Sequence, residues 1–232
     1  MRRLLVCTLG AFVLAAVTLL ADQTDNFNRT ETPVAGYDDI GDCGSGFAAN
    51  GTVVNPTQAY ASEGEGGCIA IPSSGTFATG QFAEIKITDP ADTGDESHSG
   101  PVVNMAADAT CGYEIFVHAA SAFIRQRTSA TATTDLDSES VTNTAGVQYT
   151  WRLTNNGSGV LTGTRNGSAV GGGLTATNTD CTGGKPGWMT YSGDTPLFST
   201  FDDFVYSDAA GGAASPLATL VGNPRAGGGG VR

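Results

Sequence analysis

The chain has 232 residues, of which 15% are charged and 33 are glycine. This composition disfavours long helices and suits short strands joined by turns, while an apolar fraction of 40% excludes wholesale disorder. Eleven basic residues against 23 acidic residues give a net charge of −12. Such a surface repels phosphate backbones and anionic headgroups, so we expect no binding to nucleic acid or to a membrane surface.

The N-terminus carries a hydrophobic leader. Arg2 and Arg3 precede an uncharged apolar segment at residues 4–21. This order predicts a secretory signal peptide that is cleaved after Ala21. The segment is also nearly long enough to span a bilayer, so an uncleaved anchor at residues 4–21 is the alternative and the only membrane contact that we expect. Either way we predict an exported protein that is secreted, attached to the cell surface, or part of a virion.

Export would place the cysteines in an oxidising compartment, where disulfides form. The mature chain carries Cys43, Cys68, Cys111 and Cys181, and an even number in an oxidising compartment predicts disulfides. Cys43 and Cys68 lie symmetrically about Asn55-Pro56, which we interpret as the turn of an antiparallel hairpin. We therefore predict Cys43–Cys68 and, by elimination, Cys111–Cys181. A zinc site is disfavoured because no CxxC pair is present.

Alternation of apolar and polar residues predicts most of the chain as strands. In chain order these are residues 81–88, 112–119, 122–128, 148–154, 160–165, 188–192 and 201–207. The second and third form a hairpin, and Asn166-Gly167 predicts a tight turn. No amphipathic helix follows the leader. We therefore predict one all-β domain at residues 22–208 and a flexible Gly/Ala-rich tail at residues 209–232.

Several short motifs occur in the order found in one known family. They are DNFNR at residues 25–29, QFAEI at 81–85, GPVV at 100–103, GKPG at 184–187 and FDDF at 201–204. Together they resemble the concanavalin A-like lectin/glucanase domains (LamG-type) of bacterial and phage proteins. The resemblance implies a two-sheet antiparallel jelly-roll sandwich. Residues 33–70 depart from the family pattern.

Because this fold hosts lectins, glycosidases and structural modules alike, function must come from a site. Retaining glycosidases of this fold place paired carboxylates on one face of a strand. The only comparable run is residues 135–139 (DLDSE), which begins with Asp and which we interpret as a solvated loop. We therefore predict no catalytic residue, and a glycoside hydrolase is the weakest alternative.

Sugar binding needs aromatic faces and planar polar groups. The candidate ligand-binding residues are Phe116, His118, Arg125, Arg127, Trp188 and Tyr191. The strand pair Gly112–Thr128 would bring four of them together. We predict a non-enzymatic carbohydrate-binding or adhesion module whose partner is a polysaccharide or a cell-surface glycan. Two simpler interpretations stay open: the arginines are typical of a solvated strand face, and Trp188 also suits the core.

A structural surface, fibre or virion decoration protein, which self-associates without binding sugar, is the rival prediction. The resemblance also suggests calcium as a cofactor. In this family the first and last strands tend to lie side by side, so Asp25 and Asp203 could together hold a structural calcium ion. Asp202 and Asp203 would point to opposite faces unless a bulge intervenes. The alternative is an acidic surface without metal.

Overall fold

The computed structural model describes residues 22–41, 47–50, 54–56, 67–88, 97–118, 120–192 and 199–208. Every regular element in these ranges is a β-strand, and none of them contains a helix that could cross a membrane. The strands are β1 (Gln23–Asp25), β2 (Thr30–Glu31), β3 (Tyr37–Gly41), β4 (Phe47–Asn50), β5 (Val54–Pro56), β6 (Cys68–Pro72), β7 (Gln81–Thr88), β8 (Ser97–Met105), β9 (Gly112–His118), β10 (Ser121–Ser129), β11 (Ala132–Ser140), β12 (Gln148–Asn155), β13 (Val160–Arg165), β14 (Ser168–Ala169), β15 (Thr175–Thr177), β16 (Lys185–Ser192) and β17 (Thr200–Ser207). The predicted leader and tail lie outside the described residues.

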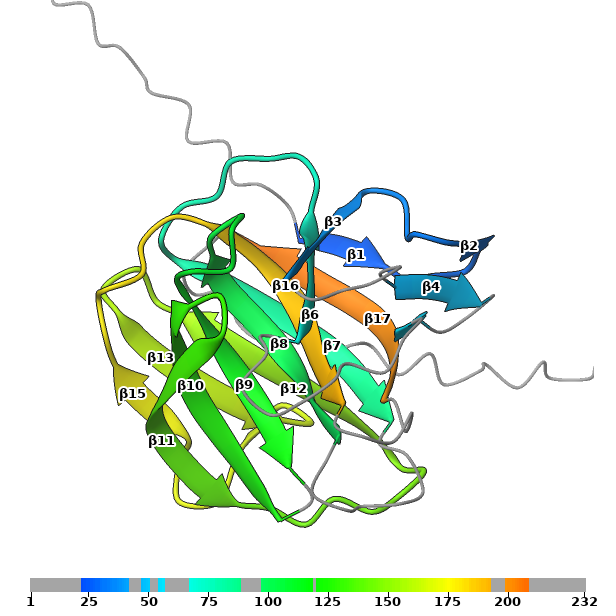
Figure 1. The fold of residues 1–232 in the computed structure, drawn as a ribbon. Coiled ribbons are helices and arrows are strands. Elements are labelled where there is room, and N and C mark those ends of the chain that lie inside the picture. The colour runs from blue at the N-terminus through cyan, green and yellow to red at the C-terminus, as the bar shows by residue number, and fades with distance from the viewer. Residues whose placement is uncertain are drawn as a thin grey trace, which may run out of the picture.

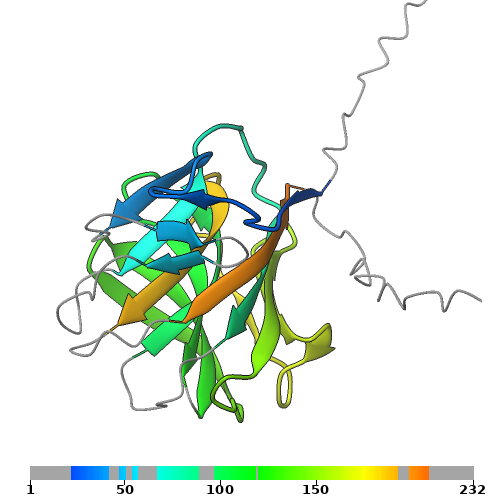
Figure 2. The same ribbon diagram turned by 90° about the vertical axis from the view of Figure 1, so that its right-hand side faces the viewer.

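The strands form two antiparallel sheets that pack face to face (Figures 1 and 2). A ten-stranded sheet has the order β14-β13-β12-β7-β17-β5-β4-β2, with β1 on β17 and β15 on β13. A seven-stranded sheet has the order β11-β10-β9-β8-β16-β6-β3. The predicted all-β sandwich is confirmed, as is the hairpin between β9 and β10.

The core lies between the sheets because one face of each strand is apolar. Tyr113, Ile115 and Val117 of β9 point inward, as do Trp151 and Leu153 of β12. All five side chains are at most 3% exposed. Burial of this kind stabilises a domain by about 25 cal/mol per Å² of apolar surface. The predicted faces of these strands are therefore confirmed.

The two outer faces differ in chemistry. The outer face of the ten-stranded sheet carries ion pairs, Glu84 with Arg152 and Lys86 with Asp203. The outer face of the seven-stranded sheet carries a second apolar cluster, made of Ile69, Ile71, Val102, Met105, Ala109, Met189 and Tyr191, with Ile40 and Phe116 packed against it. The seven-stranded sheet is thus apolar on both faces over much of its area.

One glycine explains part of the GPVV motif. A Cβ at Gly100 would lie 1.7 Å from the carbonyl oxygen of Ile115 on the neighbouring strand β9. Real side chains do not tolerate such an approach, so only glycine lets β8 and β9 come this close. The glycine of this motif therefore allows the close spacing of β8 and β9.

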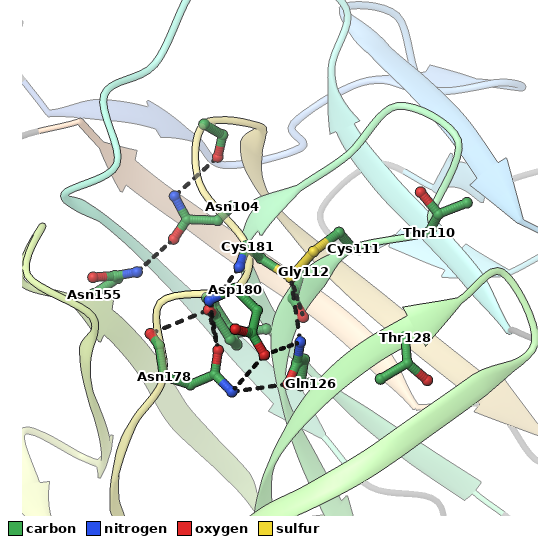
Figure 3. The surroundings of a disulfide bond; sticks show 12 residues. Asn104, Thr110, Cys111, Gly112, Gln126, Thr128, Asn155, Asn178, Asp180 and Cys181 are labelled. Carbon is green, nitrogen blue, oxygen red and sulfur yellow. Dashed lines mark hydrogen bonds between the residues drawn. A yellow bond between two sulfur atoms is a disulfide. The ribbon is translucent and has the colours of Figure 1, made fainter.

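Figure 3 shows the disulfide between Cys111 and Cys181, which confirms the second predicted pair. The backbone N–H of Cys181 donates to the Tyr113 hydroxyl over 3.0 Å. That hydroxyl donates to Asn178 Oδ1 over 2.7 Å, and Asn178 Nδ2 donates to Gln126 Oε1 over 2.8 Å. The disulfide is therefore embedded in a hydrogen-bond network that ties the loop before β16 to β9 and β10.

The reasoning behind the first predicted pair needs a correction. Asn55-Pro56 is not a turn, since both residues lie in β5, which pairs with β4. Cys68 lies opposite Gly41 in the pairing of β6 with β3, and it is disulfide-bonded. Cys43 lies outside the described residues, so Cys43–Cys68 stays a prediction.

Candidate functional site

The outer face of the seven-stranded sheet carries a row of side chains that contact one another across five neighbouring strands. In sheet order they are Tyr191 on β16, His98 on β8, Phe116 on β9, Arg125 on β10 and Asp135 on β11. We call these five residues the stacked row. Antiparallel pairing places Tyr191 opposite His98 and Arg125 opposite Asp135, while the other neighbours meet on the diagonal.

The contacts along the row are close. The rings of Tyr191 and His98 lie 5.5 Å apart, and those of His98 and Phe116 are stacked at 4.0 Å with an interplanar angle of 20°. The Arg125 guanidinium carbon lies 3.5 Å from the centre of the Phe116 ring. Arg125 Nε donates to Asp135 Oδ1 over 2.6 Å. Cation–π and charge-assisted contacts therefore hold the guanidinium in one orientation.

Both faces of Phe116 are covered. Groups that lie 3.5 Å and 4.0 Å from a ring centre must each sit over a face. His98 and Arg125 would overlap if they shared one face, so they occupy opposite faces. Phe116 therefore cannot stack on a sugar ring, contrary to the expectation from the sequence. Its part is to support Arg125.

Accessibility rises along the row towards the sheet edge. Tyr191 and His98 are 8% and 6% exposed, whereas the side chains of Arg125 and Asp135 are 19% and 53% exposed. Phe123, directly opposite Phe116, is half-buried, and its ring centre lies 5.0 Å from the Arg125 guanidinium carbon. The part of the row that a ligand can reach is thus Arg125 with Asp135, backed by two phenyl rings.

Arg127 does not belong to this accessible part. Its side chain is only 3% exposed, and Arg127 Nε donates to Glu114 Oε2 over 2.8 Å. Glu114 is equally buried, at 1%. Alternation puts Arg125 and Arg127 on the same face as predicted, but the expectation that both are solvated is wrong for Arg127, because a buried charge must be paired.

Trp188 is likewise not accessible to a ligand, which agrees with the alternative that it belongs to the core. Its side chain is 0% exposed, and its ring lies 4.6–5.6 Å from the rings of four other aromatic residues, Phe27, Tyr37, Phe47 and Phe204. Strand alternation places it on the inner face, where the ring fills the core. Tyr191 of the same strand points outward and joins the stacked row. The side chain of His118 lies outside the described part of the structure.

The carboxylate run at residues 135–139 is not a loop, which corrects the sequence interpretation. It lies in β11, where a bulge between Asp135 and Asp137 shifts the pairing with β10. Asp135 faces Arg125 on the outer face, whereas Asp137 lies opposite Ile124, a core residue, and accepts the Thr175 N–H over 2.7 Å. The bulge therefore sends the first two carboxylates of the run to different sides of the sheet. Glu139 lies opposite Ala122, another core residue, so it shares the side of Asp137 and not that of Asp135. The first and last carboxylates of the run are therefore not paired on one face of the strand.

The two predicted calcium ligands already have cationic partners. β1 and β17 do lie side by side, and Asp25 is opposite Phe204. Asp25 accepts two hydrogen bonds from Arg29, at 2.7 and 2.8 Å, and Asp203 pairs with Lys86. The pairing of β17 with β7 shifts register between Asp202 and Val205, where a bulge would be needed for both aspartates to point to one side.

Burial alone would raise the pKa of Asp25, but Arg29 and the backbone N–H of Phe27 lower it below its usual value. Calcium binding would therefore have to displace an ion pair at each carboxylate. Within the described residues no three His, Cys, Asp or Glu side chains form a group that could hold a metal.

Two members of the stacked row were missed as binding candidates by sequence reasoning. His98 precedes the GPVV motif, and its strand begins earlier than the motif suggests. Sequence reasoning places Asp135 in a loop because residues 132–140 are rich in Ser, Thr and acidic residues. The available signal was the group of charged side chains, because natural proteins place charges on edge strands.

No protein-family model matches the sequence, and no curated protein matches it. The carbohydrate-binding module CBM66 from Bacillus subtilis superposes with a TM-score of 0.52 at 12% identity, over 78% of this chain and 97% of that one. The Emp47p carbohydrate recognition domain gives a TM-score of 0.56 at 8% identity, over 79% and 93% of the two chains. The fold is a concanavalin A-like jelly roll.

Enzymes share this jelly roll as well. The GH43 protein BlXynB from Bacillus licheniformis superposes with a TM-score of 0.54 at 12% identity, over 80% of this chain. The match covers only 39% of that enzyme. At such identities the likeness establishes the concanavalin A-like fold alone.

Proposed function

We propose that this chain is an exported, non-catalytic glycan-binding module that contacts saccharides through the accessible end of the stacked row. The observation that carries the proposal is the guanidinium of Arg125, which two phenyl rings and Asp135 hold in a fixed orientation at a partly exposed position. Fixed planar donors lose little freedom on binding and suit ring hydroxyls. Structures with the same fold include a carbohydrate-binding module and a carbohydrate recognition domain.

Two further observations support an exported and non-catalytic role. A disulfide between Cys111 and Cys181 suits an oxidising compartment. The bulge in β11 separates Asp135 from Asp137 and Glu139, so the first and last carboxylates of the run do not share a face as the paired carboxylates of retaining glycosidases do.

The test replaces Arg125 with Ala and measures binding of the full chain to a glycan array. We expect binding to fall at least tenfold, because the loss leaves the hydroxyl acceptors of the sugar without their donor. The matched control is Arg152→Ala, which removes another arginine stacked on a phenylalanine (Phe82, 3.7 Å), but on the outer face of the ten-stranded sheet.

Equal loss in both variants would contradict the assignment of the site. Absence of any glycan binding by the wild-type chain, together with self-association, would instead favour a structural surface or virion protein.

A further inference from the structure

We propose that Asp135 makes the site selective for neutral saccharides that present two adjacent hydroxyls, and that it excludes uronic and sulfated ones. This inference rests on the proposed function and specifies its ligand class. Asp135 lies on the edge strand β11, is 53% exposed, and accepts the Arg125 Nε–H through Oδ1. It is therefore the most accessible member of the stacked row.

The pair offers complementary hydrogen-bonding groups. Asp135 Oδ2 has no hydrogen-bond partner among the described residues and is an acceptor, while the two Nη groups of Arg125 are likewise unpaired there and are donors. A hydroxyl can donate to the carboxylate and its neighbour can accept from the guanidinium at the same time. Two adjacent hydroxyls of one sugar satisfy both groups, and charge assistance strengthens each bond.

The charges around the pair disfavour an anion. Arg125 is neutralised by Asp135, and the neighbouring Arg127 is neutralised by buried Glu114. A carboxylate or sulfate that bound Arg125 would lie close to the negative charge of Asp135 and would be repelled by it. The net charge of −12 on the protein adds a weaker repulsion. Asp135 pairs only with Nε of Arg125, but its negative charge lies beside the two Nη groups and repels an incoming anion.

The rest of β11 extends this polar strip. Thr133, Ser138 and Ser140 lie opposite Arg127, Phe123 and Ser121, so they share the outer face with Asp135, and all three are exposed. Hydroxyl side chains both donate and accept, as sugar hydroxyls do. β11 is the last strand of the sheet on this side within the described residues, so no further strand of that part covers the strip.

The experiment compares the full-length wild type with Asp135→Asn on one array that carries neutral polysaccharides (galactan, xylan, mannan, levan) and anionic ones (polygalacturonate, alginate, heparin). We expect the wild type to bind neutral polymers only. Asp135→Asn should weaken that binding at least tenfold and should create binding to uronates, because Arg125 becomes an unpaired cation. The new binding should weaken with salt and disappear in Arg125→Ala/Asp135→Asn.

The matched control is Asp137→Asn, which removes the same charge from the same strand but from the side that faces Thr175. It should bind like the wild type, and circular dichroism should show all variants folded. Preferential binding of an anionic polymer by the wild type, or undiminished neutral binding by Asp135→Asn, would overturn the inference and leave the proposed function standing. A wild type that binds no glycan would refute the proposed function itself.

Discussion

At the scale of single residues, Arg125 and Arg127 show how position within a strand decides the role of identical side chains. They lie two residues apart in β10 on the same face. Arg125 rests on Phe116 and keeps 19% of its side chain exposed, whereas Arg127 is almost fully buried against Glu114. The first is therefore available to a ligand and the second is structural.

This difference makes Arg127→Ala strongly destabilising. Removal of one partner of a buried ion pair leaves an uncompensated charge, which typically costs about 3–5 kcal/mol of the free energy of unfolding. Arg125→Ala should cost less than about 1 kcal/mol, since partly exposed ion pairs contribute little. Urea unfolding of the two variants measures both values. The double variant Glu114→Leu/Arg127→Met should recover most of the loss, and failure to do so would show that the pair is not the cause.

At the scale of elements, the loop before β16 is held to β9 and β10 by a covalent bond and by hydrogen bonds. Cys111 and Cys181 are 70 residues apart in sequence. The hydroxyl of Tyr113 bonds both the Cys181 N–H and Asn178. The disulfide acts mainly on the unfolded chain, whereas the hydrogen bonds act on the folded one.

The two contributions can be separated. Cys111→Ala/Cys181→Ala should lower the free energy of unfolding by about 4 kcal/mol, because a loop of this length gains that much entropy when it opens. Tyr113→Phe keeps the disulfide and should cost about 1–3 kcal/mol through the lost hydrogen bonds. Chemical denaturation under non-reducing conditions gives both values. A loss below about 1 kcal/mol in the double variant would mean that the unfolded chain is constrained by other means.

At the scale of the whole molecule, the free energy of unfolding depends on pH wherever a carboxyl group has different pKa values in the folded and unfolded states. Asp39 of β3 is the clearest case. Burial raises the pKa of Asp39 to about 6, more than the weak hydrogen bond from the Phe47 N–H can offset, and the charge of Asp38 adds to the rise. Asp39 Oδ1 is buried and has no hydrogen-bond partner among the described residues.

The sign of the effect follows from the pKa of Asp39 in the two states. An aspartate in the unfolded chain has its ordinary pKa of 3.8, whereas the pKa of Asp39 in the folded protein is about 6. Between these values the native state therefore binds more protons than the unfolded state. The free energy of unfolding falls as the pH rises through this window and is then constant. A difference of about two pKa units changes the free energy of unfolding by at most about 3 kcal/mol. Because Asp39 is only partly buried, solvent screening makes the actual change smaller.

Asp39→Asn should remove this dependence. Relative to the wild type, the variant should gain stability progressively from pH 4 to pH 6 and keep the gain at pH 7. Urea unfolding of the variant and the wild type at a series of pH values measures the difference. A difference that does not change with pH would show that Asp39 titrates normally.

Much of the fold could be predicted from the sequence, because period-two alternation reflects the pleat of each strand directly. The faces of β9 and β12, the β9–β10 hairpin and the neighbouring positions of β1 and β17 agree with the sequence-based expectations. Cysteine parity predicted disulfides, but the Cys111–Cys181 pair was reached by elimination through a turn at Asn55-Pro56, which is a strand in the structure. β11 escaped prediction because Leu136 is its only large apolar residue and the bulge between Asp135 and Asp137 interrupts the period-two alternation.

The site depended on tertiary structure. Alternation gives the face of a strand but not what covers that face. Arg127 was therefore expected to be more exposed than it is, and the sequence left Trp188 open between the core and a binding site. The stacked row joins residues from position 98 to position 191, and its contacts follow from the order and register of five strands, which no local pattern encodes. The sequence by itself determined that the chain would form a disulfide-bonded β-sandwich, since strand periodicity and the number of cysteines do not depend on which segments contact one another. Only the tertiary structure decided which polar side chains remain accessible, because burial depends on packing between segments far apart in the chain.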